Sequence, residues 1–462
     1  MVKTPKRYQV DIQILGAAKT VTGSKYYLQV GDMCLLIDCG VFQGLKTLRE
    51  ENWDDLPIDV TALDMVLLTH GHLDHVGYLP RLFEQGFRGK ILGTAPTLAI
   101  AKIILEDSAK IHEEDAKRAN EEGYSKHHPA KPYYTLKTAQ QCMTLFNPVQ
   151  DQEWIQFQEY LSIRFNAVGH ILGACFIEID INGKRFVFSG DVGRPDDYLL
   201  NPPLKPQWAD VLFVESTYGD RLHDGVDITQ TLQQYIHEIV HKRGALIIPS
   251  FAVERLQTLM YILWKGYVEK HLPYVPIYVD SPMGANVLAL FERFKKWHKL
   301  TSKEYKAMCS HIHIVTSFKE TWEVIDKPNP KIVIAGSGMV TGGRVLTYIK
   351  QYVDNPDTHI LLVGYQAQGT RGRQLQEGVH ELKIYGKYFP VKAKVHTLEG
   401  LSAHADQHEL LDWLADIKNI PEQVFLTHGE AASCDAFRVK LQYEKKWHIT
   451  IPNQGQHFSF YA

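Results

Sequence analysis

Hydrophobic and polar positions alternate with two different periods along the chain, and the changes of period divide it into parts. Residues 8–37 contain short alternating runs ("VDIQIL", "YYLQV", "CLLID") separated by glycines, which predicts β-hairpins. A helical spacing follows over residues 96–122, and strand-like runs return over residues 161–189. The first part of the chain is therefore expected to be rich in β-strands, with a long helix between two groups of strands.

Beyond Asp210 helical stretches alternate with short apolar runs. The helical stretches are "TLQQYIHEIVHKR" and "ERLQTLMYILWKGYVEK", and the apolar runs are "ALIIPS", "PIYVD", "KIVIAG" and "HILLVGY". This alternation is typical of βαβ units on a mostly parallel sheet. After Val391 the pattern returns to strand and loop. Because the segments rich in His and Asp lie only in the first and last parts, we interpret the middle as an inserted domain.

Composition narrows the class of protein. A chain of 462 residues exceeds the usual size of one hydrophobic core, so two domains are expected. The net charge of −3 does not by itself favour a nucleic-acid partner, which would need a local basic patch or a metal site. The six cysteines have no CxxC spacing, the N-terminus is typical of a strand, and no apolar run has the length of a membrane span. We expect a cytoplasmic protein without a membrane partner.

The strongest chemical signal is the segment "LLTHGHLDHVGYLP" at residues 67–80. It places His70, His72, Asp74 and His75 within six positions, directly after an apolar run. Imidazole and carboxylate are ligands of zinc and related divalent ions. Four such groups on one loop are more than a single ion takes from one loop, so the cluster predicts a metal site with more than one ion.

Three further candidate ligands also follow predicted strands. His170 closes "IRFNAVGH", Asp191 follows "RFVFSG", and His428 closes "QVFLTH". Catalytic side chains of sheet proteins gather at strand ends, where loops present them from a rigid frame. We therefore expect these three residues to join the histidine loop.

A glycine-rich segment, "IAGSGMVTGGR", lies between a predicted strand and a predicted helix. Its glycines at 336, 338 and 342 miss the GxGxxG spacing by one residue, which argues against dinucleotide binding. A glycine-rich turn before a helix still offers backbone N–H groups to a phosphate.

These motifs occur in the order found in a known family. "LIDCGVFQG", "THGHLDHVGYLP", "GHILGA", "FSGDVGR", "VESTYGDRLH", "IPSFAVER", "DSPMG", "AGSGMVTGGR", "VGYQAQGTRGR", "LSAHAD" and "LTHGE" span nearly the entire chain. Together they resemble the β-CASP family of the metallo-β-lactamase superfamily. That family holds RNA-processing nucleases akin to the nuclease subunit of the pre-mRNA cleavage and polyadenylation factor and its short bacterial relatives.

The resemblance implies an α/β fold: a metallo-β-lactamase αββα sandwich with an inserted β-CASP α/β domain, a mostly parallel sheet flanked by helices. We expect the first part of the sandwich at 1–218, the insert at 219–392 and the last part at 393–462. The expected cofactor is a pair of Zn²⁺ ions, although other divalent metals fit the same donors. The implied ligands are His70, His72 and His170 for the first ion, Asp74, His75 and His428 for the second, and Asp191 as the bridge.

Three more residues acquire roles from the resemblance. Asp38 resembles the buried acid behind the histidine loop, where a hydrogen bond would orient a ligand or the loop backbone. Glu215 and His404 resemble the acid and histidine specific to β-CASP proteins, and the carboxylate would orient the imidazole. With Asp74 and Asp191 they form the expected catalytic group.

The implied activity is metal-dependent hydrolysis of RNA phosphodiester bonds at the cleft between the two domains. Two metals about 4 Å apart can supply hydroxide and neutralise the phosphate, but they supply no proton to the departing 3′ oxygen. Histidine suits that task because its ordinary pKa lies near working pH, and His404 is the candidate. The expected phosphate contacts are Ser281, Ser337, Gly338, Arg255 and Arg344, although an ion pair explains either arginine equally well.

Alternatives of other classes are weighed against this interpretation. A DNA-directed β-CASP nuclease typically carries valine where this chain has His428. Small-molecule hydrolases of the superfamily lack the insert and the "SAHAD" block. An inactive scaffold would have lost ligands, whereas all the ligand positions are filled here. The sequence leaves open endonuclease or exonuclease action, the natural RNA, the native metal and a homodimer.

Overall fold

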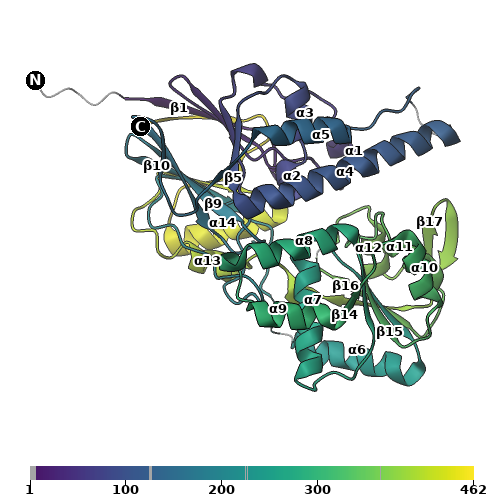
Figure 1. Ribbon diagram of the computed structural model, residues 1–462. Helices are drawn as coiled ribbons and strands as arrows, with labels where there is room; N and C mark the ends of the chain where they lie inside the picture. The colour runs from purple at the N-terminus through teal and green to yellow at the C-terminus, as the bar shows by residue number, and fades with distance from the viewer. Residues whose placement is uncertain (1–6, 124–126, 224, 226, 365) are drawn as a thin grey trace, which may run out of the picture. The chain divides into compact units, whose positions relative to one another are not determined.

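The chain folds into two compact units in the computed structural model, which describes residues 7–123, 127–223, 225, 227–364 and 366–462 (Figure 1). Unit 1 comprises Met1–Asp196, Pro202–Leu222 and His404–Ala462. Unit 2 comprises Asp197–Asn201 and His223–Ala403, so it is an insertion within the chain of unit 1.

The first sheet of unit 1 has seven strands in the order β22-β1-β2-β3-β4-β5-β6. The N-terminal hairpins pair antiparallel, as the alternating runs predict, and β3 to β6 pair parallel. Its strands are β1 (Gln9–Ile14), β2 (Tyr26–Val30), β3 (Met33–Ile37), β4 (Met65–Leu67), β5 (Lys90–Thr94), β6 (Phe146–Val149) and β22 (His457–Tyr461).

The second sheet of unit 1 also has seven strands, in the order β21-β20-β11-β10-β9-β8-β7. The strands from the end of the chain, β20 and β21, extend a sheet begun by the first part of the chain. Its strands are β7 (Ile155–Gln158), β8 (Leu161–Ala167), β9 (Cys175–Ile181), β10 (Lys184–Phe188), β11 (Val211–Glu215), β20 (Gln423–Thr427) and β21 (Ile449–Thr450).

The two sheets of unit 1 pack face to face through aromatic side chains. The ring of Tyr26 on β2 lies 5.4 Å from that of Phe213 on β11, and its hydroxyl donates to Thr427 Oγ1 at 2.9 Å. Helices pack outside, with α4 (Ala95–Glu122) against β5 and β6, and α14 (Ala431–Lys445) against β20 and β21. The remaining helices of unit 1 are α1 (Lys46–Glu51), α2 (Leu73–Val76), α3 (Leu79–Glu84), α5 (Leu136–Cys142) and α13 (Gln407–Trp413). This is the predicted αββα sandwich.

Unit 2 contains a six-stranded sheet in the order β14-β13-β15-β12-β16-β19, in which every pair is parallel. Its strands are β12 (Ala245–Pro249), β13 (Ile277–Asp280), β14 (Ile312–Ile314), β15 (Lys331–Ala335), β16 (Thr358–Val363) and β19 (Lys394–Leu398). The helices are α6 (Ile228–Lys242), α7 (Arg255–Val268), α8 (Pro282–Arg293), α9 (Ser302–Ser310), α10 (Phe318–Asp326), α11 (Val345–Tyr352) and α12 (Arg371–Gln376). A separate hairpin is formed by β17 (Glu381–Ile384) and β18 (Lys387–Pro390).

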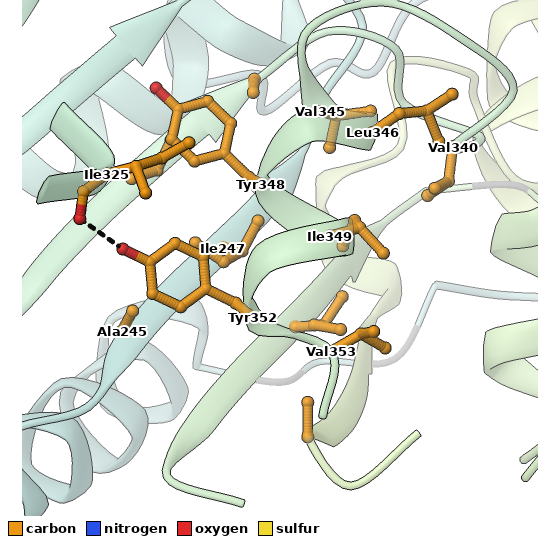
Figure 2. Close-up of a cluster of buried hydrophobic side chains, with 14 of the residues drawn as sticks. Ala245, Ile247, Ile325, Val340, Val345, Leu346, Tyr348, Ile349, Tyr352 and Val353 are labelled. Carbon is orange, nitrogen blue, oxygen red and sulfur yellow. Dashed lines mark hydrogen bonds between the residues drawn. The ribbon is translucent and has the colours of Figure 1, made fainter. Parts of the chain in front are cut away.

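One face of the unit 2 sheet is covered by a core cluster centred on α11 (Figure 2). The apolar residues of α11 recur at helical spacing, so Val345, Tyr348 and Ile349 all point into the cluster and are fully buried. The two tyrosine hydroxyls have partners: Tyr352 donates to the Ile325 carbonyl at 3.0 Å, and Tyr348 donates to Asp280 Oδ2 at 2.8 Å.

The second boundary of the insert differs from the position expected at 392/393. Residues 394–398 form β19, which pairs parallel with β16 and so belongs to the sheet of unit 2. The amino-acid pattern of a strand does not state which sheet it joins, and the pairing with β16 decides it.

Within the residues that the structure describes, no helix combines the length and the apolar character needed to span a bilayer.

Truncating the centre of the α11 cluster is expected to destabilise unit 2. Ile349→Ala removes a fully buried side chain, so the free energy of unfolding should fall by about 2–5 kcal/mol. The exposed neighbour Lys350 provides a matched control, because Lys350→Ala should change the free energy of unfolding by no more than about 0.5 kcal/mol. Hydrogen exchange of peptides from unit 2 across a urea series measures both, and equal effects would contradict the packing argument.

Candidate metal centre

The histidine loop follows β4 and enters a short helix. His70 lies three residues beyond Leu67, His72 is the N-cap of α2, and Asp74 and His75 occupy the helix itself. The loop after β3 passes against this helix, because a Cβ on Gly40 would lie only 1.5 Å from the Asp74 carbonyl oxygen. Glycine at position 40 therefore allows the two loops to meet behind the ligand candidates.

A first donor set gathers three histidines and Asp191. The Nδ1 of His72 lies 3.2 Å from His70 Nε2 and 3.2 Å from His170 Nε2. Asp191 Oδ2 lies 3.5 Å from His70 Nε2 and 3.6 Å from His170 Nε2. Ligands held tetrahedrally at zinc-type bond lengths are separated by roughly 3.3 Å, so these spacings fit a divalent ion.

A second donor set gathers Asp74, His75 and His428. His75 Nε2 and His428 Nε2 are 3.1 Å apart, and His428 Nε2 lies 3.3 Å from Asp74 Oδ2. Asp191 reaches this set with its other oxygen, since Oδ1 lies 3.4 Å from His75 Nε2. That buried Oδ1 accepts no hydrogen bond from any residue that the structure describes. A carboxylate with one oxygen toward each set fits a bridge between two cations.

Asp38 supports the loop from behind, in a left-handed backbone conformation with φ of 57°. Its Oδ2 lies 2.7 Å from His75 Nδ1, and its Oδ1 accepts the Thr69 backbone N–H at 2.8 Å. A proton on Nδ1 of His75 leaves Nε2 free to face the donor set. Asp38 thus contacts both a candidate ligand and the backbone of the histidine loop.

Two threonines that the sequence analysis did not single out orient further histidines. Thr69 Oγ1 donates to Asp38 and lies 3.1 Å from His70 Nδ1, while Thr217 Oγ1 lies 3.3 Å from His428 Nδ1. If each Nδ1 carries the proton, each hydroxyl accepts it and Nε2 faces the donor set. In the sequence, the position of Thr69 directly before His70 is the one feature that could have pointed to its role.

Burial and charge set the protonation of the donors. Burial lowers the pKa of His70 well below its ordinary value and that of His72 to about 4, so both imidazoles are neutral. Burial opposes ionisation of Asp191, but His428, His75 and His70 together hold its pKa well below the usual range. Burial also opposes protonation of His75, yet Asp191, Asp38 and Asp74 raise its pKa well above the ordinary value. A metal ion bound there would have to displace that proton.

Glu215 and His404 meet beside the first donor set. Glu215, at the end of β11, accepts the Val192 N–H at 2.6 Å, and both its oxygens lie 3.2 Å from His404 Nδ1. The opposite nitrogen, His404 Nε2, lies 4.0 Å from Asp191 Oδ2. Burial opposes protonation of His404, but the Glu215 carboxylate outweighs it and raises the histidine pKa. The pair therefore presents an N–H toward the donor sets.

The candidate phosphate contacts all belong to unit 2, where they lie beyond the carboxyl ends of parallel strands. Ser281 follows β13 and caps α8, accepting the Gly284 N–H at 3.1 Å. Ser337 follows β15, and its Oγ accepts the Thr341 N–H at 3.1 Å. A Cβ on Gly338 would lie 2.6 Å from the ring of Phe251. Ligands of α/β sheets bind at this edge.

The two arginines differ in their surroundings. Arg344 donates from Nη1 to the buried Asp280 Oδ1 at 2.8 Å and to the Ser317 carbonyl at 2.9 Å. Arg255 is 8% exposed, and within the described part of the chain its Nε and Nη1 have no hydrogen-bond partner. Arg344 is thus hydrogen-bonded within its ion pair, whereas Arg255 has only a longer ion pair, with Nε 4.0 Å from Glu254 Oε2, and keeps donors that make no hydrogen bond within the described part of the chain.

Comparison with known proteins gives three domain matches in chain order. Residues 20–238 match the metallo-beta-lactamase superfamily, residues 256–375 the Beta-Casp domain, and residues 388–452 the Zn-dependent metallo-hydrolase RNA specificity domain. A solved protein of unknown function from Enterococcus faecalis shares the fold, with a TM-score of 0.52, 11% identity, and coverage of 98% of this chain and 100% of its own.

Two curated relatives extend along most of the sequence. Ribonuclease TTHA0252 of Thermus thermophilus is 36% identical over 90% of this chain and 92% of its own length. Transcription termination factor FttA of Methanocaldococcus jannaschii is 28% identical over 96% of this chain and 71% of its own length. With matches this extensive to both the sandwich and its insert, the chain belongs to the β-CASP family of the metallo-β-lactamase superfamily.

Proposed function

We propose that this chain is a metal-dependent ribonuclease that hydrolyses RNA phosphodiester bonds with two divalent ions, zinc being the expected metal. The observation that carries the proposal is the pair of donor sets that share Asp191, with one carboxylate oxygen toward each. RNA as substrate is supported by the match to the RNA specificity domain and by the name of the Thermus thermophilus relative.

Divalent ions held by these donors would lower the pKa of bound water and offset the negative charge of the phosphate. The chain's own residues would supply the remaining step, which is protonation of the leaving group. His404, with Nδ1 held by Glu215, would donate the proton on Nε2 to the departing 3′ oxygen. Glu215 is in turn fixed by the Val192 and Thr217 backbone N–H groups, so the imidazole is oriented before substrate binds.

Unit 2 would hold the RNA backbone. Arg255 is the arginine favoured for this task, because its guanidinium has unused donors while that of Arg344 is paired with Asp280. The hydroxyls of Ser281 and Ser337 and the backbone N–H of Gly338 are further proposed donors to phosphate oxygens.

Elemental analysis tests the metal proposal directly. The purified protein should contain up to two zinc ions per chain, and Asp191→Ala should lower that content and abolish RNA cleavage while the fold persists. The reason is that the substitution removes one donor from each set. Asp196→Ala, whose side chain is 72% exposed, is the matched control and should behave as the parent. A parent protein without metal, prepared without chelator, would refute the proposal.

A milder loss of metal affinity is expected from substituting Asp38, which contacts a candidate ligand but is not itself one. Asp38→Asn weakens the hydrogen bond that orients His75, so metal affinity should fall by roughly 10–100-fold in a chelator competition assay. Asp32→Asn, at an exposed position between β2 and β3, should leave the affinity unchanged. Equal affinity of the Asp38 variant and the parent would remove Asp38 from the support of the metal centre.

The role of His404 is separable from metal binding. His404→Ala should retain the metal content and RNA affinity of the parent but lose roughly 10²–10⁴ in cleavage rate. A substrate with sulfur in place of the 3′ bridging oxygen has a leaving group that hardly needs a proton, so it should recover much of that rate. Glu215→Gln should show a smaller defect of the same kind, since it only disorients the imidazole.

The exposed His408 on α13 supplies the control, and His408→Ala should cleave both substrates at the parental rate. Loss of metal from His404→Ala would make His404 a ligand. Retained metal without relative recovery on the sulfur substrate would show that the proton comes from another group.

A further inference from the structure

The β17–β18 hairpin of unit 2 is a small sheet of its own with the sequence "ELKIYGKYFP". Tyr385 and Gly386 form its two-residue turn, with φ of 48° and 78° respectively. Positive φ at both positions gives the turn type whose twist matches that of the paired strands. The register places Lys383 opposite Tyr388 on one face.

The other face of the hairpin is anchored. Leu382 is fully buried and Ile384 is 1% exposed, and both belong to the core cluster around α11, with Phe389 packed against its edge. Since side chains alternate between the two faces of a strand, anchoring one face directs Lys383 and Tyr388 outward. The outer face is thus held in a fixed conformation by the core of unit 2.

The outward positions carry aromatic rings and cations. Tyr385 is 61% exposed and Tyr388 is 62% exposed. Lys383 Nζ lies 5.4 Å from the centre of the Tyr388 ring. Lys387 is also exposed, but the register pairs it with Ile384, so it lies at the rim of the anchored face beside the turn. Arg371 donates from Nε to the Lys383 carbonyl at 2.7 Å and from Nη1 to the Thr341 carbonyl at 3.1 Å, so its charge is fixed beside the hairpin although these donors are engaged.

The local charge of the hairpin is the reverse of that of the whole chain. Residues 381–390 contain two lysines and one carboxylate, Glu381, and Arg371 of α12 (Arg371–Gln376) adds a further cation beside them, although the chain has a net charge of −3. Exposed aromatic rings beside cations are the features with which proteins bind single-stranded nucleic acids: bases stack on the rings and phosphates meet the cations.

A second exposed aromatic pair in unit 2 gives a contrast. Phe318 and Trp322 on α10 are 54% and 42% exposed, and their rings meet edge to face. The helix carries one lysine, Lys319, against three acids, Glu320, Glu323 and Asp326, and this excess of negative charge repels a polyanion. Charge complementarity therefore selects the hairpin, and not α10, as the surface for nucleic acid.

We propose that the β17–β18 hairpin binds single-stranded RNA, with bases stacked on Tyr385 and Tyr388 and with a phosphate contacting Lys383, while Lys387 and Arg371 add positive charge beside it. The proposal deepens the proposed ribonuclease function and rests on RNA being the substrate. It assigns to unit 2 a binding surface separate from the carboxyl edge of its sheet.

Fluorescence anisotropy with a labelled 30-nucleotide single-stranded RNA tests the proposal, using the full chain with the His404→Ala substitution so that the RNA stays intact. Adding Tyr385→Ala and Tyr388→Ala together should weaken binding about ten-fold or more, because each stacked base contributes on the order of a five-fold effect. Tyr385→Phe with Tyr388→Phe keeps both ring faces and should bind as the parent. Tyr274→Ala, at an exposed tyrosine of the same unit, is the matched control and should also bind as the parent.

Unchanged RNA affinity in the double alanine variant would overturn the proposal. So would a fall in oligomeric state by light scattering without loss of RNA affinity, since the hairpin would then be a protein interface. The phenylalanine variant excludes a folding defect at these positions. A chain with native His404 that binds this RNA through the hairpin but cleaves no RNA would refute the proposed nuclease function while leaving the hairpin proposal intact.

Discussion

The arrangement of the candidate metal centre depends on the burial of one carboxylate, Asp191, between two groups of histidines. Asp191 is 2% exposed and directs one oxygen to each donor set. A buried anion is costly unless cations or hydrogen bonds compensate it, and Oδ1 accepts no hydrogen bond from any part of the chain that the structure describes. The constraint is met if positive charge lies on both sides of Asp191, and the imidazoles and carboxylates around it are donors that can hold divalent cations there.

The histidines around Asp191 are in turn held by hydrogen bonds from a surrounding layer of residues. Asp38 and Thr69 hold the histidine loop, Thr217 meets His428, and Glu215 fixes His404 through its two oxygens. Asp38 and His428 adopt left-handed backbone conformations, with φ of 57° and 49°, that are unfavourable for residues other than glycine. The centre thus includes unfavourable backbone conformations at one candidate ligand and at the acid that contacts His75.

Unit 2 presents two surfaces that differ in their chemistry. Its parallel sheet brings several loops to one edge, where the buried Arg255 keeps unused donors, while Arg344 is neutralised by Asp280. Its hairpin instead exposes Tyr385 and Tyr388 beside Lys383, while Leu382 and Ile384 on the opposite face are buried in the core. In our proposals the first surface contacts the RNA backbone through hydrogen bonds and the second binds bases through stacking.

The sequence by itself determined the kinds of element, because hydrophobic periodicity is a local property of the chain. Its motifs, in family order, indicated the family, and that resemblance implied the αββα sandwich with its insert. The sequence also named the ligand candidates at strand ends. Only the tertiary structure decided that β19 joins the sheet of unit 2, that Thr69 and Thr217 orient histidines, and which arginine is already paired. Most of these depend on residues far apart in the chain: Arg344 meets an acid 64 positions away, and Thr217 meets a histidine 211 positions away. A pattern along the sequence carries no information on such distances, since they are set by how sheets and helices pack.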